Sequence, residues 1–176
     1  MAKPHEPQKK NTSNAEKSNG AIENLTNHWI FKVNDDSNEK YALNGIDIYN
    51  HRMKDEAWGI KQYIKNGRKA ANVAHLRVGD RVVFYLCGNE GHCFLGTAKL
   101  KTGYPLVELM VHEEHLDWKQ GVKLTDIRKW NRRVPIESLR EKVRFVPEGK
   151  NYGSYIQGAV TRISDSDYNT IIENGY

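Results

Sequence analysis

The chain has 176 residues, 28% of them charged, with a formal net charge of +5 and two cysteines. This length suits one compact domain with a tail. Two cysteines are too few for a disulfide framework, and no apolar run approaches the ~18–20 residues of a membrane span. Composition therefore excludes a membrane-spanning protein and a disulfide-stapled secreted domain. We expect a soluble, cytoplasmic protein with free thiols at Cys87 and Cys93, and a basic surplus compatible with a nucleic-acid partner.

The first segment, residues 1–27, is rich in Lys, Asn, Ser, Glu and Pro and has few aliphatic side chains. It cannot bury enough apolar surface to offset the entropy lost on ordering, so we predict a disordered polar tail. The folded domain is predicted to occupy residues 28–176. It opens with a β-rich run from His28 to Val33, which a polar Asn-Asp-Asp sequence ends.

The segments after this strand are polar and weakly patterned. Residues 37–57 predict a loop or insertion that contains a short helix near 50–56. Trp58-Gly59-Ile60 predicts a brief extended piece, and residues 67–75 predict a turn with a short helical piece. None of these segments shows a long amphipathic helix.

Strands and turns dominate the chain from residue 76 onward. The predicted strands are 81–86, 93–100, 107–112, 121–130 and 158–163. A glycine-bounded turn at 88–91 joins the first two into a hairpin. We predict a short helix at 137–142 and a C-terminal helix that Ser164 caps. No strand is followed by the long helix of a βαβ unit, so the pattern indicates an α+β protein with a small mixed or antiparallel β-barrel.

The motifs of the common enzymes and metal sites are missing. The chain has no G-x-S-x-G, no P-loop and no H-E-x-x-H sequence. His112 and His115 could share a metal, as could Cys87, His92 and Cys93, but loop and strand positions are the favoured interpretations for both sets. No spaced carboxylate pair lies in an apolar setting, and Asp80 fits a turn cap. We therefore expect neither catalysis nor a metal or cofactor.

Basic residues gather in one part of the chain. Residues 118–150 carry a net charge of +6, and the remainder carries −1. Within this part, Arg128-Lys129-Trp130-Asn131-Arg132-Arg133 interleaves basic and aromatic side chains. Such a run can bind phosphates and stack on bases, or it can be a solvated loop whose Trp130 packs into the barrel. Trp29 fits the core, whereas Trp58 and Trp118 fit exposed or pocket positions.

The order of these signals resembles the EVE domain family, a PUA-like fold related to YTH and ASCH domains. The matching segments, in chain order, are 28–32, 58–60, 76–86, 94–98, 104–105, Trp118 with 122–124, 136–139, 157–164 and 167–168. The resemblance covers about residues 28–173. It implies a PUA-like mixed β-barrel with short peripheral helices, a C-terminal helix and a pocket for a single base, often a modified one.

The resemblance also implies which residues form the pocket. Trp58, with Gly59 beside it, matches the first tryptophan of an aromatic cage. Asn34 and Asp35 match the polar strand end that contacts the base edge, and Tyr104, with Trp118 behind it, is the candidate second aromatic. The candidate phosphate-binding residues are Lys32, Arg128, Lys129, Arg132 and Arg133. A departure is Val33-Asn34-Asp35, which stands where thymocyte-type relatives carry Ser-Glu-Pro.

The predicted function is non-enzymatic binding of DNA or RNA that carries a flipped, modified base such as a methylated one. Stacking in an aromatic pocket offsets the energy lost when a base leaves its stack. The alternative is a sensor of a modified nucleoside or another small molecule, or an accessory protein of an RNA-modification or restriction system. DNA and RNA are not distinguished by the sequence.

Overall fold

The computed structural model describes residues 26–35, 43–60, 72–109, 119–147, 151, 155–156 and 158–175. The strands are β1 (His28–Val33), β2 (Ala57–Gly59), β3 (Arg81–Leu86), β4 (Cys93–Leu100), β5 (Val107–Glu108), β6 (Gln120–Pro135) and β7 (Val160–Ile163). The helices are α1 (Gly45–Lys54), α2 (Asp165–Glu173) and the short 3-10 helices η2 (Val73–His75) and η3 (Ile136–Leu139). Within these ranges no helix has the length and apolarity to cross a membrane.

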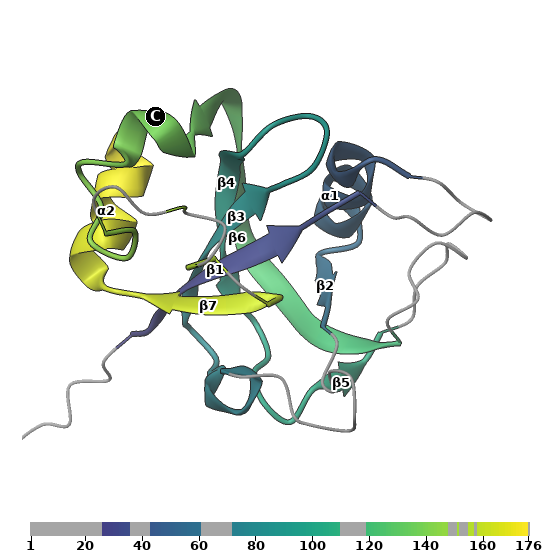
Figure 1. Ribbon diagram of the computed structural model, residues 1–176. Coiled ribbons are helices and arrows are strands. Elements are labelled where there is room, and N and C mark those ends of the chain that lie inside the picture. The colour runs from purple at the N-terminus through teal and green to yellow at the C-terminus, as the bar shows by residue number, and fades with distance from the viewer. Residues whose placement is uncertain are drawn as a thin grey trace, which may run out of the picture.

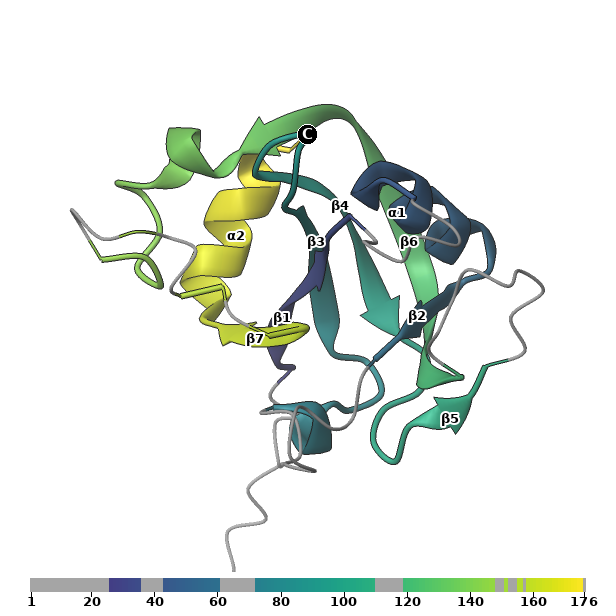
Figure 2. The same ribbon diagram turned by 45° about the vertical axis from the view of Figure 1, so that its right-hand side comes forward.

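The strands form one curled, mixed sheet. Its order is β2-β6-β4-β3-β1-β7, with β5 paired to β6. β1 and β3 run parallel, and the other neighbours are antiparallel. The long strand β6 curves around the sheet from β2 to η3, and α1 and α2 lie on opposite sides of the molecule (Figures 1 and 2). The predicted α+β class with a mixed, barrel-like sheet and a C-terminal helix is confirmed.

Alternation along the strands builds two apolar cores. In β1, Trp29 and Phe31 join one core, whereas Ile30 joins the other. Side chains of α1 complete the first core, and η3 and α2 complete the second. Because successive side chains of a strand point to opposite faces, a strand covered on both faces appears as a continuous apolar run, as β1 and β3 do.

The boundaries of several predicted elements differ from the structure. The predicted last strand, 158–163, begins at Val160, and the predicted strand from Val107 ends at Glu108. The first helix is Gly45–Lys54 rather than 50–56, because the Asn44 side chain accepts a hydrogen bond from Asp47 N and starts the helix earlier. The predicted strand 121–130 continues to Pro135, and the predicted helix 137–142 is the 3-10 helix η3. The β6 extension carries many exposed polar residues, which hide its strand character in the sequence. Residues 110–112 of the predicted strand 107–112 lie outside the described residues.

Asp80 has a larger role than the predicted turn cap. Its side chain is buried and accepts hydrogen bonds from Trp29 Nε1 at 2.8 Å and from Arg77 N at 2.9 Å. It also accepts hydrogen bonds from the backbone and side chain of Asn27, the last residue of the segment predicted as a tail. Residues 1–25 of that segment lie outside the described residues. Asp80 therefore joins the start of β1 to the turn before β3.

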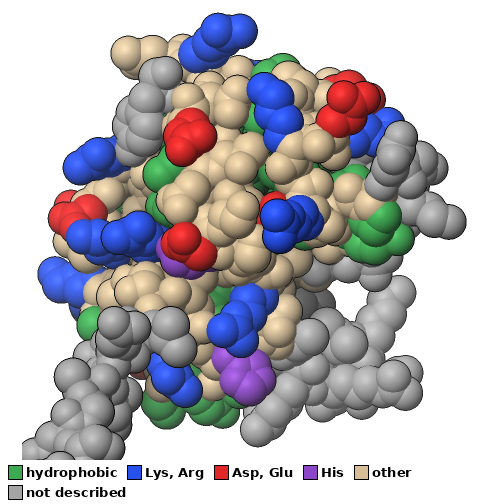
Figure 3. Space-filling view, turned by 90° about the vertical axis from the view of Figure 1, so that its left-hand side faces the viewer, with side chains coloured by type: hydrophobic (Ala, Val, Ile, Leu, Met, Phe, Trp, Pro, Cys, Tyr) green, Lys and Arg blue, Asp and Glu red, His purple; other side chains and the backbone are tan. Residues whose placement is uncertain are grey.

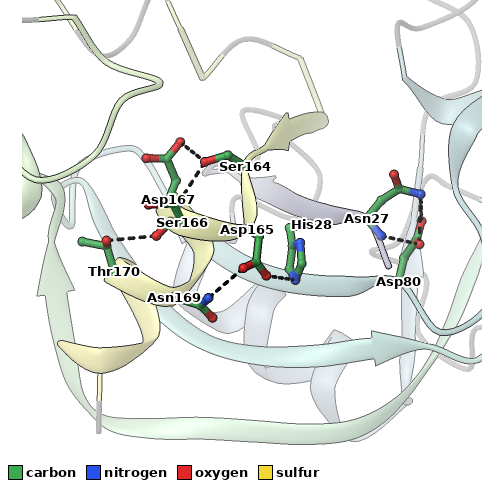
Figure 4. Close-up of polar contacts among 9 residues, drawn as sticks. All are labelled: Asn27, His28, Asp80, Ser164, Asp165, Ser166, Asp167, Asn169 and Thr170. Atoms are coloured by element: carbon green, nitrogen blue, oxygen red, sulfur yellow. Dashed lines mark hydrogen bonds and ion pairs between the residues drawn. The ribbon is translucent and has the colours of Figure 1, made fainter. Parts of the chain in front are cut away.

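The C-terminal helix begins as the sequence predicts. The Ser164 side chain accepts a hydrogen bond from Asp167 N at 3.1 Å and donates one to Asp167 Oδ2 at 2.7 Å (Figure 4). Tyr168 of α2 packs its ring against the buried imidazole of His28, with centroids 4.5 Å apart. His28 Nε2 lies 3.4 Å from Asp165 Oδ1. The first strand and the last helix therefore meet at His28.

The fold is expected to become less stable as the pH is lowered through about 6.5, the ordinary pKa of histidine. Burial lowers the pKa of His28, and the Arg81 charge acts in the same direction, against Asp165 and Asp80. The folded state therefore holds His28 neutral. Its contribution is complete above the unfolded pKa and is lost as the pH falls toward the folded pKa.

Urea unfolding between pH 7.5 and 5 measures this effect. His28→Gln should flatten the pH dependence, whereas His75→Gln, at an exposed position of η2, should leave it as in the wild type. An unchanged slope in His28→Gln would contradict the assignment.

Candidate functional site

Trp58 lies at the centre of a buried aromatic cluster rather than at an exposed position. It is 0% exposed, and its ring stacks on Phe84 at a centroid distance of 4.8 Å, with Phe31 tilted at 5.8 Å. The β2–β6 pairing positions it, with Trp58 opposite Val122 and Gly59 opposite Gly121. A Cβ on Gly121 would lie 2.0 Å from Trp58 O, so only glycine permits this close approach.

A cation that the sequence analysis did not identify covers this tryptophan. Arg52, from the last turn of α1, places its guanidinium carbon 4.5 Å from the centroid of the Trp58 ring. Arg52 is 7% exposed, and burial lowers its pKa to about 10. Arg52 Nε and Trp58 Nε1 are both buried without a hydrogen-bond partner. A cation stacked on a tryptophan face is attracted by the ring, yet these two polar atoms remain unsatisfied.

The predicted base-edge residues lie at the other end of α1. Asp35 accepts hydrogen bonds from Asn89 N and Gly45 N, and these backbone donors, Asn89 first, lower the pKa of its carboxyl. Gly88, at φ +138°, makes room for the Asp35 carboxylate. Asp35 thus connects the end of β1 to α1 and to the β3–β4 turn.

Asn34 is exposed, and its Oδ1 accepts a hydrogen bond from Cys87 Sγ. Gly45, which lies beside Asn34, and Arg52 are seven positions apart in α1, a rise of about 10 Å along the helix axis. The structure therefore places Asn34 and Trp58 near opposite ends of α1, not in direct contact.

The second predicted aromatic is not found beside Trp58. Tyr104 is 36% exposed, its backbone N donates to Leu76 O, and it precedes Pro105 through a cis peptide bond. Among the ring contacts of the described residues, none joins Tyr104 to Trp58. Trp118 lies outside the described residues. Phe31 and Phe84 are the aromatic neighbours that the structure provides, and their positions in apolar strands predicted only a core role.

A bulge interrupts the pairing of the basic run of β6 with β4. Phe94 and Gly96 of β4 are separated by one residue, whereas their partners Val134 and Lys129 are separated by four, residues 130–133. Lys129 Nζ donates to Asn50 Oδ1 of α1 at 2.9 Å. Lys129, at the edge of the bulge, therefore lies beside the helix that carries Arg52.

The other residues predicted to bind phosphates differ in their surroundings. Arg128 and Arg132 are exposed, and Arg133 pairs with Glu90 at 3.0 Å. Lys32 Nζ donates to Ile156 O at 3.2 Å, on the β7 side of β1. Lys32 and the β6 run therefore belong to different parts of the surface. On the face in Figure 3, which carries α2, basic and acidic side chains are mixed.

Trp130 packs inward, so the structure favours the second of the two interpretations of this residue. It lies against the core formed with η3 and α2, and a Cβ on Gly175 would lie 2.6 Å from its ring. The indole of Trp130 therefore anchors the run 128–133 beside the end of α2.

The described residues contain no group of three or more His, Cys, Asp or Glu side chains that could hold a metal ion. Burial raises the pKa values of Cys87 and Cys93, which are free thiols. His92 Nδ1 lies 3.2 Å from the hydroxyl of Tyr85. The segment from His112 to His115 lies outside the described residues.

The curled mixed sheet with a helix on each side is a PUA-like fold, which defines the class of the protein. The sequence matches the EVE domain family over residues 27–174. The chain belongs to the EVE domain family. None of the curated protein sequences matches it.

Solved structures share this fold at low sequence identity. Human THYN1, solved in complex with 5-methylcytosine-containing DNA, is 10% identical, with a TM-score of 0.54 over 84% of this chain and 96% of that chain. The YTH domain of Zygosaccharomyces rouxii MRB1, in complex with N6-methyladenosine RNA, is 13% identical, with a TM-score of 0.55 over 87% and 88%. A hypothetical protein from Leishmania major is 18% identical, with a TM-score of 0.55 over 84% and 93%.

Proposed function

We propose that this protein binds DNA or RNA and holds one unstacked, modified base against the indole of Trp58, without catalysing a reaction. Membership of the EVE family supports this, as do two proteins of similar fold, THYN1 and the MRB1 YTH domain, which were solved in complex with a methylated nucleic acid. The observation that carries the proposal is the aromatic cluster around Trp58, in which buried polar atoms of Trp58 and Arg52 lack partners. Orphaned polar atoms beside an aromatic face are what a base with hydrogen-bonding edges would satisfy.

The energies are consistent with this role. Extracting a base costs a few kcal/mol, and less when it is unpaired. Stacking on an aromatic side chain returns about 1–3 kcal/mol, and a buried methyl group adds about 0.8 kcal/mol. Phosphate contacts must supply the remainder, and the exposed cations of β6 beside α1 are suitable for them.

Fluorescence polarisation with matched oligonucleotides tests the proposal. Single-stranded and duplex DNA and RNA, each unmodified or carrying one 5-methylcytosine or N6-methyladenine, are titrated with the wild-type protein. Tighter binding of a modified strand supports the proposal, and its backbone type identifies the partner. Equal binding of all strands would contradict base recognition. Salt-insensitive binding of free nucleosides alone would favour the nucleoside sensor instead.

The cations of β6 are expected to set the salt dependence of binding. Replacing Arg128, Lys129 and Arg132 with glutamine should reduce the magnitude of the slope of log K against log[salt] by about 2–3. Each phosphate contact that is lost means about one counterion fewer released on binding. Modified and unmodified strands should weaken equally, since phosphate contacts carry no base information.

The matched control removes three exposed cations at the opposite end of the β3–β4 hairpin, Arg77, Arg81 and Lys101. This variant loses the same total charge, but its slope of log K against log[salt] should stay close to that of the wild type. Equal loss in both triple variants would show that general charge, not the β6 run, attracts the nucleic acid.

A further inference from the structure

The stacking surface of Trp58 is already in use in the free protein. Trp58 is 0% exposed and contacts both the Phe84 ring and the Arg52 guanidinium. A base can therefore stack on this indole only if one of these partners leaves. Phe84 is 0% exposed and belongs to the central strand β3, so its departure would disrupt the sheet. Arg52, on a peripheral helix, is the partner that can move.

Little holds Arg52 in this position except the ring itself. Its Nε has no hydrogen-bond partner, and no carboxylate of the described residues forms an ion pair with it. Burial alone accounts for the lowered pKa of its guanidinium. A buried cation without a counter-ion is unfavourable. Release of the guanidinium toward an anion would therefore be favourable.

We propose that Arg52 determines the ligand class of this site: in the free protein its guanidinium occupies the position of the base on Trp58, and the ligand is a nucleotide whose base replaces the guanidinium and whose phosphate receives it. This inference rests on the proposed function. The guanidinium is planar, so a base can replace it on the indole, and its donor geometry matches phosphate oxygens. A nucleoside displaces Arg52 without offering it an anion, so the site selects nucleotides over free nucleosides.

The helix α1 contacts the basic run of β6 through a different residue. Asn50, two residues before Arg52, accepts the hydrogen bond from Lys129. Side chains two residues apart on a helix do not face each other, so this contact places Lys129 beside α1 but not beside the Arg52 guanidinium. The phosphate that receives Arg52 is therefore the one attached to the stacked base, whereas the β6 cations would contact other phosphates of a longer strand.

Calorimetric titration with three probes tests the inference. The probes are 5-methyl-2′-deoxycytidine, its 5′-monophosphate and an oligonucleotide that carries it, with the N6-methyladenosine set in parallel. In the wild type, the monophosphate should bind at least about tenfold more tightly than the nucleoside, as expected for a charge-assisted bidentate contact. The oligonucleotide distinguishes a chain phosphate from a free one.

Arg52→Met keeps the length and apolar stem of the side chain and removes the charge. In this variant the nucleoside should bind more tightly than to the wild type, because nothing charged must leave the indole, and the preference for the monophosphate should fall below about threefold. If Arg52→Met still binds the oligonucleotide, weaker binding of the nucleoside or an unchanged preference for the monophosphate would overturn the inference. No binding of any probe to the wild type would overturn the proposed function and the inference together.

A second measurement, by NMR, uses only the wild-type protein. The ring current of Trp58 should shift the Arg52 Hε resonance upfield in the free protein, and the bound monophosphate should move it back. Arg162, whose guanidinium lies 5.9 Å from the Trp29 ring and donates to Asn27, is the internal control and should not move. If the Arg52 Hε resonance had its ordinary chemical shift in the free protein, the proposal that the guanidinium occupies the position of the base would be overturned.

Discussion

Replacing Asp80 with asparagine is expected to lower the free energy of unfolding by about 3 kcal/mol, because hydrogen bonds to a buried charged acceptor contribute about 1.5–3 kcal/mol each. The carboxylate is 2% exposed and accepts from Trp29 Nε1, from Arg77 N and from Asn27. Asparagine offers one acceptor oxygen and turns an NH₂ group toward these donors. At least one donor is then buried without a partner.

Thermal unfolding measures this loss, with about 6–12 °C expected for a chain of this size. The matched control is Asp126→Asn. Asp126 is exposed and pairs with Lys99 at 2.8 Å, and exposed ion pairs contribute little to stability. Similar small shifts in both variants would show that Asp80 does not hold the segments together.

Replacing Trp58 with alanine should abolish base recognition and also lower the free energy of unfolding by about 3–5 kcal/mol, the usual cost of a large buried aromatic. The sequence alone favours an exposed or pocket tryptophan, whose loss would barely affect stability. The structure changes this expectation because Trp58 is 0% exposed and packs on Phe31 and Phe84. Binding must therefore be measured well below the melting temperature of the variant.

Trp29→Phe is the control that separates stability from recognition. Trp29 is also 0% exposed and lies in the same core, and its ring nitrogen donates to Asp80. Its replacement should lower stability and leave the preference for a modified base unchanged. If Trp29→Phe lost the preference as Trp58→Ala does, the loss would reflect general destabilisation, and Trp58 would not be the base-stacking residue.

The candidate site is only partly visible in the sequence. Trp58 and the basic run of β6 stand out because a tryptophan beside glycine and a cluster of cations are unusual in their local surroundings. Arg52 does not stand out, since one arginine on a polar helix is ordinary. Its importance comes from a contact with Trp58, six residues later, that depends on how α1 turns into β2. The placement of the base pocket and phosphate contacts remains a prediction that the binding experiments test.

The sequence by itself determined the features that depend on neighbouring residues. The apolar runs of β1, β3 and β4, the glycine turn between β3 and β4, and the Ser164 cap of α2 all follow from local patterns. Only the tertiary structure decided the contacts and irregularities that depend on distant segments. These are the carboxylate of Asp80, which joins segments about 50 residues apart, the bulge that interrupts the pairing of β6 with β4 at residues 130–133, and the guanidinium on Trp58. Local patterns reflect backbone preference and burial, which act over a few residues. These long-range contacts require the register of the sheet and the direction of α1, which are set only when the whole core packs.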